Sequence, residues 1–181
     1  MSENHVASYR NSVVPFHPDQ LVISPCGLRQ IKQLRFMLYT VFPELVSLKP
    51  SQWLAISATS QVALYDGMVL GVICSRLEAD ERKITKDKNS GKLEQPVLYR
   101  CYVAHLACLA PYRQLGIGTQ LMQNVIDTCI QRGDVVAVYL HTQVSNKAAI
   151  KCYTNLGFSI VATHSNYYPY EDGYLMVKHL V

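Results

Sequence analysis

The sequence has 181 residues, 49% of them apolar, and a formal net charge of +4 from 17 basic and 13 acidic residues. This length suits one domain with one sizeable core. No stretch approaches the ~20 apolar residues of a membrane span, and the first twenty residues lack the apolar core of a signal peptide. We therefore expect a cytoplasmic protein, with nuclear presence allowed, that does not insert into a membrane.

The charged residues and the cysteines exclude several classes of site. Lys and Arg are not clustered, so direct nucleic-acid binding is not expected, although a mild positive charge suits a small polyanionic cofactor. The six cysteines form no CxxC pair, which favours reduced thiols over a disulfide framework. His105 and Cys108 have no second pair to complete four metal ligands, and no metal is expected.

Residues 1–20 mix polar side chains with two prolines, and we predict a mobile leader to a single domain at 21–181. Pro25 lies near the predicted start of the first helix. That helix must stop near Phe42, since proline disfavours a helical residue before it. Its apolar face has helical spacing and consists of Leu28, Ile31, Leu34 and Leu38.

The next segment carries a second short helix around Trp53 and then a hairpin signal. Asp66 and Gly67 stand between two apolar runs, and both residues tolerate a positive φ. Residues 79–96 hold nine charged residues and no aromatic residue. We interpret that segment as a mobile hairpin extension with little to bury.

The second half of the chain alternates strands and helices. Residues 97–109 read as a long strand, 115–132 as an amphipathic helix, and 135–144 as another strand. A shorter helix to about Leu156 and two closing strands follow. The order predicts an α/β domain with a central mixed, twisted sheet and one strand–helix–strand crossover. The apolar face predicted for the long helix consists of Leu121, Met122, Val125, Ile126, Cys129 and Ile130.

The sharpest motif joins the long strand to the amphipathic helix. Gly116 and Gly118 remove side chains where a backbone must approach a ligand closely. The unpaired N–H groups at the helix start suit a pyrophosphate. A bare G-x-G would favour an ordinary glycine turn. The complete loop is Arg113, Gln114, Leu115, Gly116, Ile117, Gly118 and Thr119.

This Arg-x-x-G-x-G loop resembles the coenzyme A pyrophosphate loop of the GNAT superfamily of acetyltransferases. A second superfamily element, N-x-x-A-x-x-x-Y-x-x-x-G-F, is matched by Asn146, Ala149, Tyr153, Gly157 and Phe158. From about Tyr99 to Tyr168 the chain is most similar to the NatE group of N-terminal acetyltransferases. The resemblance implies a GNAT fold with helices on both faces and a splayed strand pair that holds acetyl-CoA, with no metal.

The resemblance also implies roles for residues on the central strands. Tyr102 and His141 would hold a water that takes the proton of the acceptor amine, and Tyr153 would lie near the sulfur. Taken from the sequence alone, His141 is as well explained by a core histidine and Tyr102 by a half-buried strand tyrosine. The backbone groups that would pair with the pantetheine belong to Leu106, Ala107, Cys108 and Leu109.

The acceptor site implied by the resemblance lies between a loop after the first helix and a tyrosine-rich hairpin. Where the family has an apolar residue and a tyrosine, this chain has Glu44 and Val46, which leaves the usual preference for Met followed by an apolar residue open. The implied acceptor-binding residues are Phe42, Pro43, Glu44, Val46, Ala104, Tyr167 and Tyr168.

Three interpretations follow. The favoured one is an acetyltransferase acting on protein N-termini or nascent chains, which allows membership of a ribosome-associated complex. The second is a related enzyme acting on a lysine or a small-molecule amine. The third is a non-catalytic acetyl-CoA-binding subunit, against which the presence of both Tyr102 and His141 argues.

Overall fold

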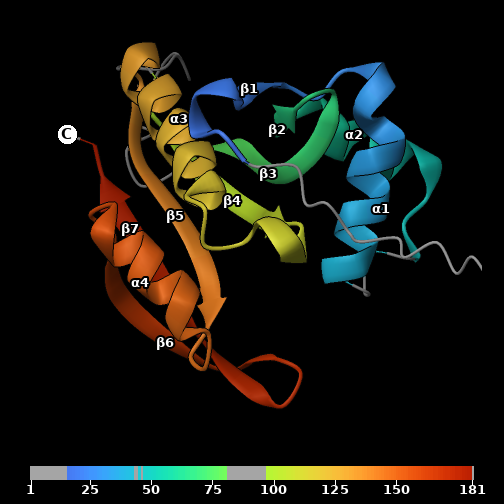
Figure 1. Cartoon of the computed structure of the whole chain (residues 1–181). Coiled ribbons are helices and arrows are strands. Elements are labelled where there is room, and N and C mark those ends of the chain that lie inside the picture. Colours follow the sequence, from blue (N-terminus) through green and yellow to red (C-terminus); the bar gives the residue numbers. More distant parts are fainter. Residues whose placement is uncertain (1–15, 43–44, 46, 81–96, 181) are drawn as a thin grey trace, which may run out of the picture.

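The computed structural model describes residues 16–42, 45, 47–80 and 97–180, and Figure 1 shows the arrangement. Within these ranges the strands form one mixed sheet in the order β1-β2-β3-β4-β5-β7-β6. All neighbouring pairs are antiparallel except β4 and β5, which are parallel. The helix α3 connects these two strands, as the predicted strand–helix–strand crossover requires.

The first half of the chain contains the elements β1 (Val22–Pro25), α1 (Ile31–Val41), α2 (Pro50–Ala58), β2 (Ser60–Tyr65) and β3 (Met68–Ala79). The predicted helix is confirmed, but a 3₁₀ turn at Leu28–Gln30 precedes it, and it ends at Val41, two residues before Pro43. The placement of Pro25 near a helix start was wrong. Pro25 ends a short edge strand, where its missing N–H group costs no central ladder bond.

The turn between β2 and β3 has the backbone that the Asp-Gly pair predicts. Asp66 has φ 48° and Gly67 has φ 74°, so both central residues are left-handed. This pattern is typical of the tightest hairpins, whose twist matches that of the flanking strands.

The second half contains β4 (Tyr99–Cys108), α3 (Ile117–Arg132), β5 (Val135–Gln143), α4 (Lys147–Asn155), β6 (Ser159–Tyr168) and β7 (Glu171–His179). The helix α3 ends at Arg132, and the following Gly133, which has φ 79°, caps it. The apolar pattern predicts closing strands at 158–163 and 173–180, but both extend further into the tyrosine-rich hairpin, because the β6–β7 pairing resumes after a register shift at Tyr168 and Glu171.

Two clusters of buried side chains lie on opposite faces of the sheet, one under α1 and α2 and the other under α3 and α4. Of the predicted apolar face of α3, five residues are buried, whereas Ile130 is 54% exposed. Ile130 lies in the last turn of α3, and its exposure corrects the prediction. The close approach of α3 depends on Gly71 of β3, where a Cβ atom would stand 2.8 Å from Cγ2 of Ile117.

Several predictions fall on residues outside the described ranges. These are the leader up to residue 15, most of the charged segment at 79–96, and the acceptor-loop residues Pro43, Glu44 and Val46. Phe16 is described, and its ring lies 5.3 Å from that of Tyr65. Among the described helices, none is both long and apolar enough to cross a membrane.

Candidate active site

The glycine loop forms the turn at the start of α3. The chain leaves β4 through a 3₁₀ turn at Ala110–Tyr112, and Gln114 and Gly116 then adopt positive φ values of 64° and 81°. Gly116 is the N-cap of α3, and a Cβ atom placed there would meet no atom within 4 Å. The backbone at this helix end is therefore uncovered on the side that Gly116 faces.

This helix end has the groups that bind an anion. The first intrahelical bond of α3 runs from the Gln120 N–H to the Gly116 oxygen at 3.0 Å, so the N–H groups of the preceding turn have no acceptor within the helix. The helix dipole adds partial positive charge at the same end. Arg113 lies beside this turn, and its Nε donates to the Cys108 carbonyl oxygen at 3.2 Å. The arrangement fits the phosphates of a coenzyme.

Beside this loop, the central strands separate. The parallel pairing of β4 with β5 ends at Val103 and Leu140. Beyond that point, Leu106 and Ala107 pair only with β3 on their other side. Within the described residues, the resulting splay leaves this edge of β4 without a strand partner, and the segment there is the one that the family resemblance implies would hold pantetheine.

The second motif places α4 at the mouth of the splay. The Asn146 side chain caps α4 by accepting from the Ala149 N–H at 3.1 Å. One face of α4 then presents Tyr153, which is only 8% exposed. Burial raises the pKa of the Tyr153 phenol, so it remains a protonated hydrogen-bond donor at neutral pH.

A cavity of about 240 Å³ lies where β4 and β5 part. Of the predicted site residues, the structure gathers in its lining Phe42, Tyr102, Ala104, Leu106, Asn146, His141, Tyr153, Tyr167 and Tyr168. The cavity lining does not include Ala107, Cys108, Leu109, Ala149 or the loop from Arg113 to Thr119. Ala107 packs in the cluster under α1, so its side chain cannot reach a ligand and only its backbone could.

The lining also contains residues that the sequence did not assign to the active site, namely Val103, His105, Leu140, Thr142 and Gln143. His105 is explained by a bulge in β4. Cys74 pairs with His105 and Ser75 with Val103, so Ala104 is one extra residue on this strand. A bulge re-aims the neighbouring side chains. Strict alternation would have put His105 on the face opposite Tyr102, and no turn or proline signal marks the bulge.

Tyr102 is held by aromatic and cationic neighbours. Its ring lies 5.0 Å from the Tyr139 ring, and the Arg76 guanidinium lies 4.4 Å above it. Burial, followed by hydrogen bonding with Tyr167, raises the pKa of the Tyr102 phenol. Tyr102 therefore stays protonated at neutral pH, and it can orient a water but not remove a proton as a phenolate.

His141, unlike Tyr102, can act as a base. Its ring lies 6.0 Å from that of Tyr102 and is stacked on the Tyr167 ring at 4.1 Å with an angle of 11°. Both ring nitrogens are buried and have no hydrogen-bond partner among the described residues. Burial, and then the charge of His164, lower the pKa of His141. The neutral imidazole that results can accept a proton near pH 7.

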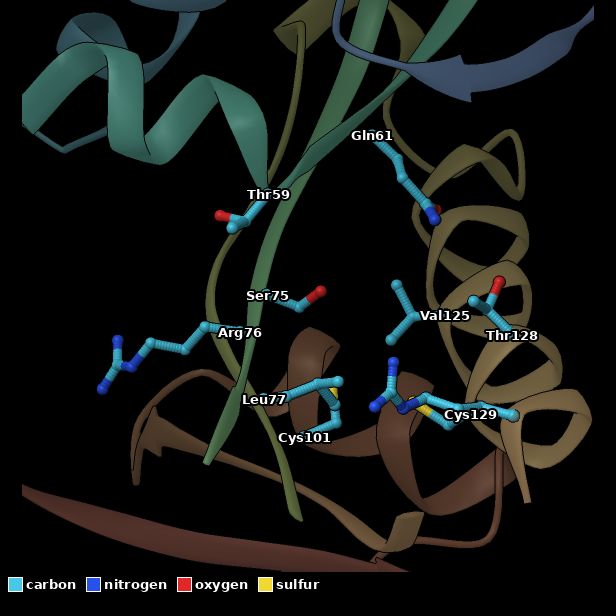
Figure 2. A pocket seen from close by; sticks show the side chains of 10 residues that line it. Thr59, Gln61, Ser75, Arg76, Leu77, Cys101, Val125, Thr128 and Cys129 are labelled. Carbon is cyan, nitrogen blue, oxygen red and sulfur yellow. The ribbon is translucent and has the colours of Figure 1, made fainter. Parts of the chain in front are cut away.

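A second cavity, of about 230 Å³, lies between β3 and α3 (Figure 2). Its lining includes Ser75, Cys101, Val125 and Thr128, and Figure 2 shows Arg76 extending to the other side of β3 from α3. None of the predicted site residues lines this cavity. The cavity at the splay is therefore the candidate active site.

Comparison with known proteins agrees with this geometry. The model of the Acetyltransferase (GNAT) family matches residues 30–158. N-alpha-acetyltransferase 50 of Danio rerio is 30% identical over 146 residues, which cover 81% of this chain and 77% of that protein. Probable N-acetyltransferase san of Drosophila melanogaster is 30% identical over 149 residues, covering 81% of this chain and 70% of that protein.

Solved structures share the fold. Arabidopsis thaliana Naa50 in complex with the bisubstrate analogue CoA-Ac-MVNAL has a TM-score of 0.70 and 29% identity, covering 88% of this chain and 98% of that one. Arabidopsis thaliana NAA60 in complex with acetyl-CoA has a TM-score of 0.73 at 20% identity, covering 88% and 99%, and shows likeness of fold alone. The resemblance stated from the sequence is confirmed. The chain belongs to the GNAT acetyltransferase family.

Proposed function

We propose that this enzyme transfers the acetyl group of acetyl-CoA to the α-amino group of a protein or nascent chain, with Met-initiated chains as the expected acceptors. The observation that carries the proposal is the meeting of Tyr102, His141 and Tyr167 in one cavity at the β4–β5 splay. The names of the zebrafish relative and of the Arabidopsis complex with CoA-Ac-MVNAL point to the same reaction.

Acetyl-CoA would lie along the splay. Its pyrophosphate would accept from the N–H groups at the start of α3, near Gly116 and Gly118, with Arg113 beside it. Its pantetheine would add to the free edge of β4 at Leu106 and Cys108. The thioester supplies the activated acetyl group, so no nucleophilic side chain is needed. Burial raises the pKa of the Cys108 thiol to about 11, which argues against that thiol as a nucleophile.

The acceptor must lose a proton before it attacks. An α-amino group has a pKa of about 8, so a weak base is sufficient, whereas a lysine at about 10.4 needs more assistance. His141 would accept the proton through a water that the Tyr102 hydroxyl helps to orient. The Tyr153 phenol would donate to the departing thiolate or hold the pantetheine. One backbone N–H of β4 would polarise the thioester carbonyl.

The acceptor chain would approach between the end of α1 and the β6–β7 hairpin. Phe42 lines the cavity from one side, and Tyr167 and Tyr168 from the other. Ala104 lies on β4 between them and would contact the first residue of the acceptor. Acceptors of this class suggest a cytoplasmic location and association with a complex that acts on nascent chains.

A peptide-array acetylation assay tests this proposal. The array varies the first two residues of the peptides and includes peptides with a blocked N-terminus and one free lysine, together with small polyamines. The expected result is acetyl transfer to free N-termini, strongest for peptides that begin with Met. Transfer confined to lysines or polyamines would contradict the N-terminal assignment, and absence of transfer with bound acetyl-CoA would indicate a non-catalytic subunit.

A further inference from the structure

A second histidine lies beside His141. His164 is on β6, opposite Gly173 of β7, which in turn lies opposite Gln143 of β5. The His164 side chain is exposed, and its ring centroid is 5.2 Å from that of His141 at an angle of 42°. The His164 ring is also 6.0 Å from the Tyr167 ring that covers the other part of His141.

The surroundings of His141 offer little to balance a positive charge. No Asp or Glu belongs to the described lining of the cavity. The titratable groups that line this cavity together with His141 are Tyr102 and His105 from β4, Tyr153 from α4, and Tyr167 and Tyr168 from the hairpin. The guanidinium of Arg76, from β3, lies 4.4 Å above the ring of Tyr102. The phenols of Tyr102 and Tyr153 stay protonated at neutral pH, because burial raises the pKa of each.

We propose that His164 is a positioning residue for acetyl transfer: a positive charge on its ring, 5.2 Å from the ring of His141, opposes protonation of His141, which therefore stays able to accept a proton in more acidic solution. The inference rests on the base role of His141 in the proposed function. The expected effect of the His164 charge has the same sign as the change in the pKa of His141, which is lowered first by burial and second by His164. No role in catalysis was expected of His164 from the sequence.

The charge of His164 can be separated from its ring by a pair of substitutions. His164→Gln removes the charge and keeps a polar side chain, whereas His164→Lys keeps a positive charge and removes the ring. A unit positive charge about 5 Å from a second titrating group, in a setting between bulk water and a protein surface, lowers the titration midpoint of that group by about 0.5 to 2 pH units. The exposed His179, at the far end of β7, is the matched control position.

The measurement is the titration midpoint of His141, followed by NMR of the imidazole nitrogens in the whole protein and assigned with His141→Gln. His164→Gln should raise the His141 midpoint by about 0.5 pH units or more, while His164→Lys should leave it unchanged or lower it. His179→Gln should have no effect. An unchanged midpoint in His164→Gln, or equal shifts in both His164 variants, overturns the proposal.

Enzyme kinetics test whether the effect of His164 on His141 changes catalysis. The acid limb of the pH profile of kcat/KM should move to higher pH in His164→Gln by the same amount as the NMR midpoint, and 1 M salt should reduce the difference from the wild type, because screening then acts over about 3 Å. A shifted midpoint with an unmoved acid limb would refute the link between His164 and catalysis. If no peptide is acetylated, the proposed function fails, whereas the NMR titration still decides whether His164 controls His141.

Discussion

Gly173 of β7 leaves the space in which the Tyr167 side chain lies. A Cβ atom at position 173 would stand 3.0 Å from both Cβ and Cδ1 of Tyr167. Tyr167 in turn stacks on His141 at 4.1 Å. The absence of a side chain on β7 thus places a ring of the β6–β7 hairpin against the proposed base on β5.

Gly173→Val should therefore displace the Tyr167 ring from His141. Because misplacement by about 1 Å can cost up to ~10²-fold, we expect kcat/KM for peptides to fall by about tenfold or more, with acetyl-CoA affinity unchanged. In a Tyr167→Ala background, Gly173→Val should add almost nothing, since the ring that it displaces is gone. Full additivity of the two changes would show that Gly173 acts through some other contact.

Gly116→Glu should abolish acetyl-CoA binding, measured by calorimetry at moderate salt without metal. The substitution places bulk and negative charge at the anion site of α3. Gly133→Glu is a matched control, because Gly133 caps the opposite end of the same helix with φ 79° and likewise has no atom within 4 Å of a built Cβ. Equal loss in both variants would indicate misfolding, and binding that requires a divalent cation would contradict the metal-free assignment.

Tyr102→Phe and His141→Ala should lower kcat strongly while acetyl-CoA affinity barely changes. Loss of general-base assistance typically costs about 10²–10⁴ in rate. If both side chains act on one water, the double variant should lose much less than the product of the single losses. If His141 is only a core histidine, His141→Ala will instead lower Tm and leave the folded protein with normal turnover.

The pH profile of the reaction should be set by His141 and by the acceptor amine. Because the pKa of His141 is lowered, its base form is present at neutral pH, and activity should be lost only as the pH falls below about 6.5, the ordinary value. Above that range, the rate should rise with pH towards about 8 as the acceptor amine loses its proton. Tyr102→Phe should make the dependence on pH steeper.

Replacing residues 79–96 with a short Gly-Ser turn should leave turnover within a few fold of the wild type. The composition of this segment cannot support a core. The measurement is kcat for a peptide acceptor, with Tm as the check that the variant is folded. Complete loss of activity in a folded variant would show that the segment contributes to the site.

Local patterns determined most of the fold. The helix ends at Val41 and Gly133 and the Asp66-Gly67 turn follow from short-range backbone preferences that a few neighbouring residues settle. The anion-binding character of the glycine loop follows for a similar reason, since the N–H groups at a helix start need partners outside the helix.

Contacts between distant segments were decided only by the tertiary structure. The edge strand ending at Pro25 exists because β2 pairs with it, and the bulge at Ala104 depends on the register of β3 against β4. The approach of His164 on β6 to His141 on β5 depends on the pairing of both strands with β7, which brings the two rings to 5.2 Å. Pairing register and side-chain packing depend on partners far along the chain, so no local pattern encodes them.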